Sequence, residues 1–137
     1  MHHRLNATPL EVRRGLRDLR RELRNAGATN RLRDTAEQVL AEVLNNIVEH
    51  ALAGRQDGQI HLIVKTSGNG LTVRIRDNGC AMPGGSLPLG QLSPLSDTID
   101  SLPEGGFGWY IIHNLTQDLC YLRKPGWNTL SFRIVAS

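Results

Sequence analysis

The chain has 137 residues, of which 39% are hydrophobic and 21% are charged, as expected for one globular domain with a sizeable core. It contains no apolar run long enough to span a membrane and no apolar secretory segment at its N-terminus. Cys80 and Cys120 have no metal-ligand spacing and form no disulfide framework. With a mild net charge of +3, these features predict a reduced, cytoplasmic protein.

The first predicted elements are a short edge strand over residues 2–6 and an amphipathic helix. Thr8 and Pro9 suit the N-cap and first helical position of this helix, and Gly27 suits its C-cap. The helix carries six arginines interleaved with acidic residues, which we interpret as a solvated face. An acidic protein partner is the open alternative. Nucleic acid is disfavoured because no aromatic residues lie among the arginines.

A second helix is predicted from Asn30 to Ala51, with a broad apolar stripe. Glu42, Asn46 and His50 recur in it at four-residue spacing and therefore share one face. A carboxylate and a carboxamide on a mostly buried helix each cost about 1–3 kcal/mol if they lack partners. The row is therefore either the wet edge of the helix or the wall of a site.

The pattern then changes to alternation, which predicts two antiparallel strands over residues 60–65 and 71–76. Residues 67–70 contain Asn-Gly, a strong hairpin signal. The second strand ends in Asp77-Asn78-Gly79. This sequence is either a plain turn or a site in which the carboxylate accepts a hydrogen bond from a ligand amine and Gly79 lets a flat ring approach.

Regular patterns stop between Pro83 and Pro103, where four of the six prolines lie. A long irregular loop in a small domain is often an active-site lid, and one helical turn around residues 92–99 is expected within it.

An apolar helix follows, and then two strands around residues 119–123 and 129–135, joined by a turn at Pro125-Gly126. The predicted fold is α+β, a two-layer sandwich with helices on one face of a mixed, mostly antiparallel sheet. The whole chain, 1–137, forms a single domain with a lid at about 83–104.

The loop closes with Gly105-Gly106-Phe107-Gly108 at the start of the apolar helix. Glycine-rich turns that lead into a helix bind phosphate, because backbone N–H groups and the helix dipole converge there. Such a short motif is weak evidence by itself. Its order after the Glu42 to Asn46 row and after Asp77-x-Gly79 is more specific.

This order of motifs resembles the GHKL ATPase superfamily over most of the chain. Glu42-x-x-x-Asn46 looks like the N box, Asp77-x-Gly79 like the first glycine box and Gly105-Gly106-x-Gly108 like the second. The chain is similar to the anti-sigma factor serine/threonine kinases, the partner-switching kinases of bacteria, in its small size, its opening Ala7-Thr8-Pro9, the His-Ala that follows the N box and the segment from Gly126 to Phe132. The resemblance implies the histidine-kinase-like ATP-binding fold.

The resemblance also implies an ATP–Mg²⁺ site, with family roles carried over to the matching residues. Glu42 would be the general base and Asn46 the Mg²⁺ ligand. Asp77 would bind the adenine amino group, with Gly79 beside the ring, and phosphate would be bound by Gly105, Gly106 and Gly108. Ser131, with Thr129 as the second choice, would bind adenine through water.

Three neighbouring residues qualify these assignments. Ala81 stands where the first glycine box usually has a second glycine, which affects the expected backbone path at 80–85. Asn45 is next to the N-box asparagine but does not share its face. His50 matches a frequent family position, and we expect it to pack against the helix rather than to bind ligand.

The implied function is that of an ATP-dependent serine/threonine protein kinase of a partner-switching system. It would phosphorylate a STAS-type anti-sigma factor antagonist and sequester a sigma factor or another regulator, as a homodimer without a direct nucleic-acid or membrane partner. Two alternatives stay open: an ATP-binding sequestration module without phosphotransfer, and an adaptor that binds no nucleotide. The carboxylate at Glu42 favours the kinase.

Overall fold

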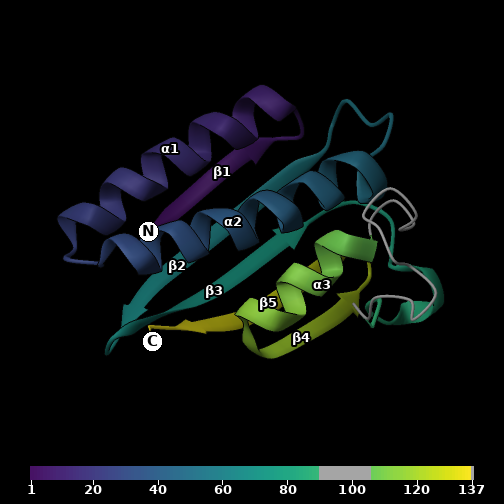
Figure 1. Cartoon of the computed structure of the whole chain (residues 1–137). Helices are drawn as coiled ribbons and strands as arrows, with labels where there is room; N and C mark the ends of the chain where they lie inside the picture. Colours follow the sequence, from purple (N-terminus) through teal and green to yellow (C-terminus); the bar gives the residue numbers. More distant parts are fainter. Residues whose placement is uncertain (90–105, 137) are drawn as a thin grey trace.

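The computed structural model describes residues 1–89 and 106–136, and the predicted helices and strands are present in the predicted order (Figure 1). The expected helical turn around 92–99 and most of the expected lid lie outside the described residues. The elements are β1 (His2–Asn6), α1 (Pro9–Asn25), α2 (Asn30–Asn46), the π-helical turn η1 (Ile47–Ala51), β2 (Gln59–Ser67), β3 (Gly70–Asp77), the 3-10 turn η2 (Pro83–Gly85), α3 (Gly106–Leu115), β4 (Gln117–Lys124) and β5 (Trp127–Val135).

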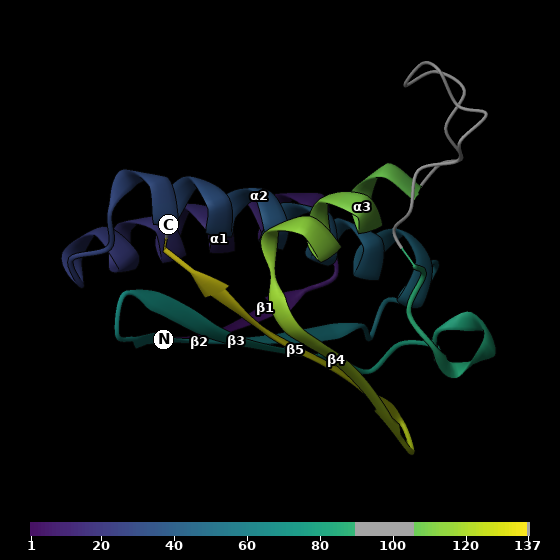
Figure 2. The ribbon, with the colours of Figure 1, turned by 60° about the horizontal axis from the view of Figure 1, so that its bottom comes forward.

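The five strands form one sheet in the order β1-β2-β3-β5-β4. Every pair of neighbours is antiparallel, so the sheet that we expected to be mixed is antiparallel throughout its described strands. Figure 2 shows α1, α2 and α3 on one side of this sheet. The α+β two-layer architecture predicted from the sequence is therefore confirmed.

An aliphatic core fills the space between the two layers. Alternate residues of β2 and β3 point toward the helices and are buried, whereas the residues between them are more exposed. The stripe predicted for α2 is likewise buried, from Leu32 to Leu44. Burying one such aliphatic side chain contributes roughly 1.5–3 kcal/mol, so this stripe fixes which side of α2 faces the sheet.

The ends of α1 follow the predicted capping pattern. The Oγ1 atom of Thr8 accepts a hydrogen bond from the Glu11 N–H at 3.1 Å, with Pro9 in the first turn. After the helix, Gly27 has φ +89°, and its N–H donates to the Arg24 carbonyl at 3.0 Å. A positive φ suits glycine because it has no Cβ. The sharp turn lets α2 return antiparallel to α1.

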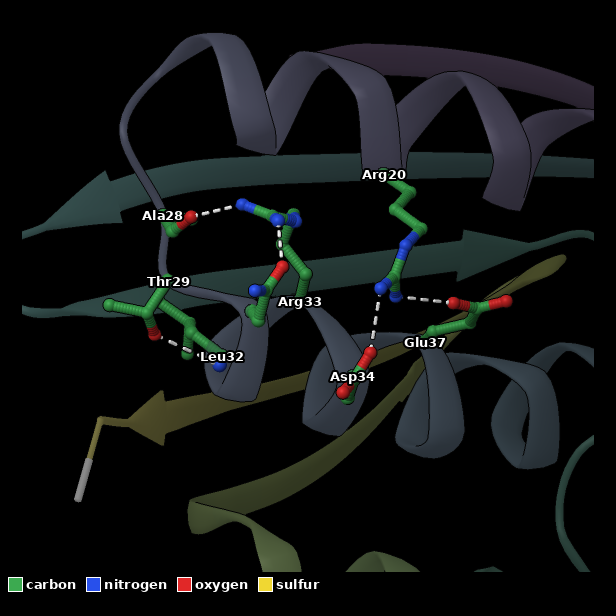
Figure 3. Close-up of polar contacts among 8 residues, drawn as sticks. Arg20, Ala28, Thr29, Leu32, Arg33, Asp34 and Glu37 are labelled. Atoms are coloured by element: carbon green, nitrogen blue, oxygen red, sulfur yellow. Dashed lines mark hydrogen bonds and ion pairs between the residues drawn. The ribbon is translucent and has the colours of Figure 1, made fainter.

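Ion pairs join α1 to α2 at their exposed edges (Figure 3). The Arg20 guanidinium donates to Asp34 and to Glu37, both at 2.7 Å. Arg33 donates to the Ala28 carbonyl and to the Asn30 side chain at the start of α2. Exposed pairs of this kind contribute little to stability because water and salt screen them, so they serve mainly to align the helices.

The β2–β3 hairpin forms at the predicted residues, 67–70. Ser67 pairs with Gly70, so the two loop residues are Gly68 and Asn69. Gly68 has φ +59°, which fits a type II′ turn with glycine first. The Asn-Gly signal therefore located the turn correctly, with Asn69 as its second central residue and Gly70 as the first residue of β3.

No helix in the described ranges, 1–89 and 106–136, has both the length and the apolar character needed to cross a lipid bilayer.

Candidate nucleotide site

A cavity of about 550 Å³ opens where α2 and η1 approach α3 and the ends of β3, β4 and β5. Most of its wall is apolar and includes Ile47, Trp109 and Leu130. A small set of polar side chains also reaches it, and these are Asn46, His50, Asp77, Cys80, Tyr121 and Asn128. An apolar cavity with a few convergent polar groups is the usual form of a small-molecule site.

The N-box row lies on α2 with its two polar residues one turn apart. Asn46 is half-buried and lines the cavity, and its Nδ2 atom donates to the Glu42 carbonyl at 2.8 Å. That bond leaves the Oδ1 atom of Asn46 as a free acceptor among the residues that the structure describes. Glu42 is also half-buried but lies outside the cavity wall, against the first turn of α3.

The glycines of the second box meet this row from the other side. Gly108 is buried in α3, and a Cβ added to it would lie 2.7 Å from the Oε2 atom of Glu42. Only a residue without a side chain lets α3 come so close to the carboxylate without displacing it. Gly106 begins α3, and the predicted phosphate residue Gly105 lies outside the described residues.

Asp77 ends β3 on the inner face of the sheet and is only 4% exposed. Its Oδ1 atom accepts two hydrogen bonds at 2.9 Å, from the Gly79 N–H and from the Asn128 Nδ2. The other oxygen, Oδ2, has no partner among the described residues. Burial raises the pKa of the Asp77 carboxyl, although the bonds from Asn128 and Gly79 act in the opposite direction.

Gly79 is required for a reason that the sequence did not reveal. A Cβ on Gly79 would lie 2.4 Å from the carbonyl oxygen of Ala51. The same carbonyl accepts the Cys80 N–H at 2.9 Å. The first glycine box is therefore packed directly against the end of η1, and the absence of a side chain serves this backbone contact.

The π turn itself was not predicted. In η1 the Leu52 N–H donates to the Ile47 carbonyl at 2.9 Å, five residues back rather than four. Such turns are rare and often lie at functional sites. Here the π turn follows Asn46 directly and aims the Ala51 carbonyl at the loop after β3. No residue type in this stretch distinguishes a π turn from a continuing α-helix, so periodicity alone could not find it.

Asn128 is a residue of the cavity that sequence reasoning missed. It lies opposite Asp77 in the β3–β5 register and is 5% exposed. Besides Asp77, its Nδ2 donates to the Cys80 carbonyl at 2.8 Å, and its Oδ1 accepts from the Tyr121 hydroxyl at 2.5 Å. The Tyr121 hydroxyl in turn accepts the Met82 N–H at 2.9 Å. Alternation with the core residues of β5 was a signal that could have placed Asn128 inward.

Arg123 closes the same network at its exposed side. Its guanidinium donates to the Gly79 carbonyl at 2.7 Å and to the Asn128 Oδ1 at 3.1 Å. Both amide atoms of Asn128 are therefore engaged, which fixes the orientation of the side chain that holds Asp77. Hydrogen bonds to both ends of this amide make the wall beside Asp77 rigid.

The structure does not bring Ser131 to the cavity. The inner residues of β5 are Asn128, Leu130, Phe132 and Ile134, so Ser131 and Thr129 lie between them on the opposite face. Ser131 pairs with Arg74 of β3. The strand alternation therefore separates both predicted hydroxyls from Asp77, and we assign neither of them to the nucleotide.

His50 departs from its expected packing role. It is exposed and lines the cavity beside Ala51. Ala81, which replaces a glycine of the first box, is exposed at the cavity wall as well. The backbone path at 80–85 therefore accommodates alanine there without burying its side chain.

Comparisons with known proteins agree with this arrangement. The family model described as the histidine kinase-like ATPase domain matches residues 5–134. The serine/threonine-protein kinase BtrW of Bordetella bronchiseptica is 35% identical over 102 residues, which cover 74% of this chain and 69% of BtrW. The serine-protein kinase RsbW of Bacillus thuringiensis is 27% identical over 119 residues, which cover 80% of this chain and 72% of RsbW.

A solved structure has the same fold. It contains the RsbU and RsbW domains of Rv1364c from Mycobacterium tuberculosis and superposes with a TM-score of 0.66 at 17% sequence identity. The match covers 98% of this chain and 32% of that longer chain. At this identity the likeness concerns the fold alone.

Proposed function

The chain belongs to the histidine kinase-like ATPase domain family, as its motifs predicted, and from this premise we propose that it is the kinase of a bacterial partner-switching system. Its relatives are named serine/threonine- and serine-protein kinases, and the chain is an enzyme of that class. In this proposal it transfers phosphate from ATP to a serine or threonine of a STAS-type anti-sigma factor antagonist.

One observation carries the proposal: Glu42 and Asn46 stand one helical turn apart between a buried carboxylate and the first turn of α3. Asn46 shares the cavity with Asp77, while Glu42 faces Gly108. The cavity thus has an acceptor for a ligand amine at one wall and a helix start suited to phosphate near the other. ATP is a ligand whose two ends match these walls.

Asp77 is suited to the adenine amino group. Its two hydrogen bonds from the protein both end on Oδ1, so Oδ2 remains able to accept a bond from a ligand amine. An amine that satisfies this oxygen offsets part of the burial cost of the carboxylate. A base with a carbonyl at that position would instead present an acceptor to an acceptor.

Asn46 fits the predicted Mg²⁺ site because its Oδ1 has no partner among the described residues, while its Nδ2 donates to the backbone carbonyl of Glu42. The described residues contain no cluster of three or more His, Cys, Asp or Glu side chains that could hold a metal. That agrees with an ion bound by one amide oxygen together with phosphates and waters. When bound, Mg²⁺ would neutralise phosphate charge. Gly106 and Gly108 stay our proposed phosphate residues, together with Gly105.

Glu42 is our proposed general base. Its carboxylate has no hydrogen-bond partner among the described residues, and it lies one turn from Asn46 on the same face of α2. From there it would accept the proton of the attacking serine or threonine hydroxyl. Phosphoryl transfer depends mainly on positioning, and the absence of a side chain at Gly108 lets the first turn of α3 lie beside the carboxylate.

The partners are inferred from family membership. We propose that the antagonist is the phosphorylation substrate, that a sigma factor or another regulator is sequestered, and that the kinase acts as a homodimer in the cytoplasm, where sigma factors work.

A second candidate, an ATP-binding sequestration module without phosphotransfer, would use the same cavity without needing Glu42. The adaptor that binds no nucleotide loses its support with the family match.

Transfer of label from γ-labelled ATP to the STAS-domain protein encoded nearest to this chain tests the proposal. We expect transfer by the wild type and a fall of about 100-fold or more in Glu42→Gln, with ATP affinity within about twofold of wild type. Glu49→Gln, which removes an exposed carboxylate in η1, is the matched control and should transfer normally. Wild-type rates in Glu42→Gln would exclude Glu42 as the base, whereas ATP binding without transfer by the wild type would favour sequestration.

A further inference from the structure

The face of the sheet away from the helices is open, and no described helix lies on it (Figure 2). Strand pairing arranges its side chains in rows that run across the strands. One row runs from Arg4 through His61 and Arg76 to Thr129. The next row contains Arg74 beside Ser131. We call the outward side chains of β1, β2, β3 and β5 the open face.

The open face carries positive charge almost without compensation. Only Arg133 has a carboxylate partner among the described residues, the Asp118 side chain at 3.7 Å on the edge strand. The Arg76 guanidinium lies over an aromatic ring. The cations of the face other than Arg76 and Arg133 have no partner among the described residues. The exposed cations of the face are Arg4, Lys65, Arg74, Arg76 and Arg133.

This pattern differs from that of a face that only contacts water. Solvated surfaces usually mix both signs, and like charges on neighbouring strands destabilise a sheet. The two arginines of β3 alternate with core residues, so both point outward. Their strand partners on β5 are the hydroxyl residues Ser131 and Thr129. A guanidinium group can bind a carboxylate through two parallel hydrogen bonds, and a neighbouring hydroxyl can donate a further one.

We propose that the open face is a docking surface for an acidic segment of a partner protein. The partner's carboxylates would pair with Arg4, Arg74 and Arg76 and accept hydrogen bonds from the two hydroxyls. This surface is separate from the nucleotide cavity, which lies on the helical side of the same sheet. It does not depend on the proposed phosphotransfer.

The aromatic residues of the face argue against single-stranded nucleic acid. Arg76 lies over the Trp127 ring, 4.8 Å from its centroid, and His61 meets that ring edge-on at 5.7 Å between centroids. The Trp127 ring is therefore already engaged, and bases need open rings on which to stack. A second copy of the chain is disfavoured because a symmetric interface would bring two basic faces together.

His61 supplies a built-in reporter of this surface. Burial, followed by the nearby charges of Arg4, His2 and Arg76, lowers the pKa of His61. Carboxylates docked on the arginines would counter that positive field and raise the pKa. The change is measurable by NMR titration of the imidazole.

The test compares two charge-matched double variants in binding a short fluorescent poly-glutamate peptide. Arg74→Gln/Arg76→Gln should weaken binding by about tenfold, and the peptide should raise the pKa of His61 in the wild type. Arg13→Gln/Arg14→Gln removes two exposed cations from α1 and should change affinity by less than about twofold. Unchanged ATP affinity in both variants confirms that they are folded.

Three outcomes would overturn the proposal. Equal loss in both variants would mean that net charge, and not this surface, attracts the peptide. Tighter binding of a polythymidylate oligonucleotide of equal charge would assign the face to nucleic acid. If the wild type is a dimer and Arg74→Gln/Arg76→Gln is a monomer, the face is a self-association surface.

Discussion

Asp77 illustrates how one buried residue links stability to ligand binding. The folded protein binds the Asp77 proton more tightly than the unfolded chain does, because burial raises the pKa of this carboxyl. Its contribution to stability is therefore present at low pH and is lost as the pH rises from the ordinary value through the raised one. Above the raised pKa the ionised group opposes folding, and a ligand amine would relieve that cost.

Asp77→Asn should therefore stabilise the free protein and abolish ATP binding. The Oδ1 atom of asparagine retains both bonds, from Gly79 and Asn128, whereas its Nδ2 replaces the unpartnered Oδ2 and cannot accept from an amine. Urea unfolding at acidic and neutral pH should show a larger gain at neutral pH. A less stable variant at neutral pH, or one with unchanged ATP affinity, would contradict this account.

Asn46 offers a second test at the residue scale. Asn46→Ala removes the proposed Mg²⁺ ligand but only one hydrogen bond, which lies within its own helix, so we expect the fold to survive. Mg²⁺-dependent ATP binding, measured by calorimetry, should fall by at least about tenfold, or ~1.4 kcal/mol. Asn45→Ala, at the exposed neighbouring position, is the control. Undiminished ATP binding by folded Asn46→Ala would remove this residue from the site.

At the scale of elements, η1 and the loop after β3 behave as one unit. The Ala51 carbonyl receives the Cys80 N–H, and Gly79 packs against that carbonyl without a side chain between them. The Asn128 amide then bonds the Cys80 carbonyl from β5. The loop is therefore attached to both layers, and the position of Asp77 depends on them together.

Gly79→Ala should disturb this unit. The new Cβ would meet the Ala51 backbone at 2.4 Å, and such overpacking costs about 1–3 kcal/mol. Gly15→Ala is the control, because its Cβ would approach only the movable end of the Leu5 side chain, at 2.8 Å, and alanine favours a helix interior. Thermal unfolding should show a clear loss for Gly79→Ala alone. Equal melting temperatures would mean that η1 yields freely.

Across the whole molecule, the predictable features were those set by periodicity and by capping residues. Helical spacing and alternation located the helices and strands, and Thr8, Gly27 and Pro125-Gly126 marked real ends and turns. The layer arrangement followed because each element has one apolar side. Of the N-box row, Asn46 and His50 line the cavity, whereas Glu42 lies outside its wall.

The features that escaped prediction depend on contacts between distant segments. Asn128 and Ser131 are the exception, because alternation within β5 already places Asn128 inward and Ser131 outward, and the family resemblance was followed instead. The π turn and the Gly79 contact arise from the packing of η1 against a loop almost 30 residues away. Such tertiary features require the pairing register to be known first.

The sheet that separates the cavity from the open face is a single layer, and its strands serve both sides. Arg76 and Asp77 are consecutive in β3, and Trp127 and Asn128 are consecutive in β5, with one member of each pair facing each side. A ligand that shifts these strand ends on one side therefore moves the same peptide units on the other. Any such effect is mutual, because a partner that strengthens ATP binding by some factor is itself held more tightly by that factor when ATP is present. Nucleotide occupancy would then change the partner's affinity without direct contact.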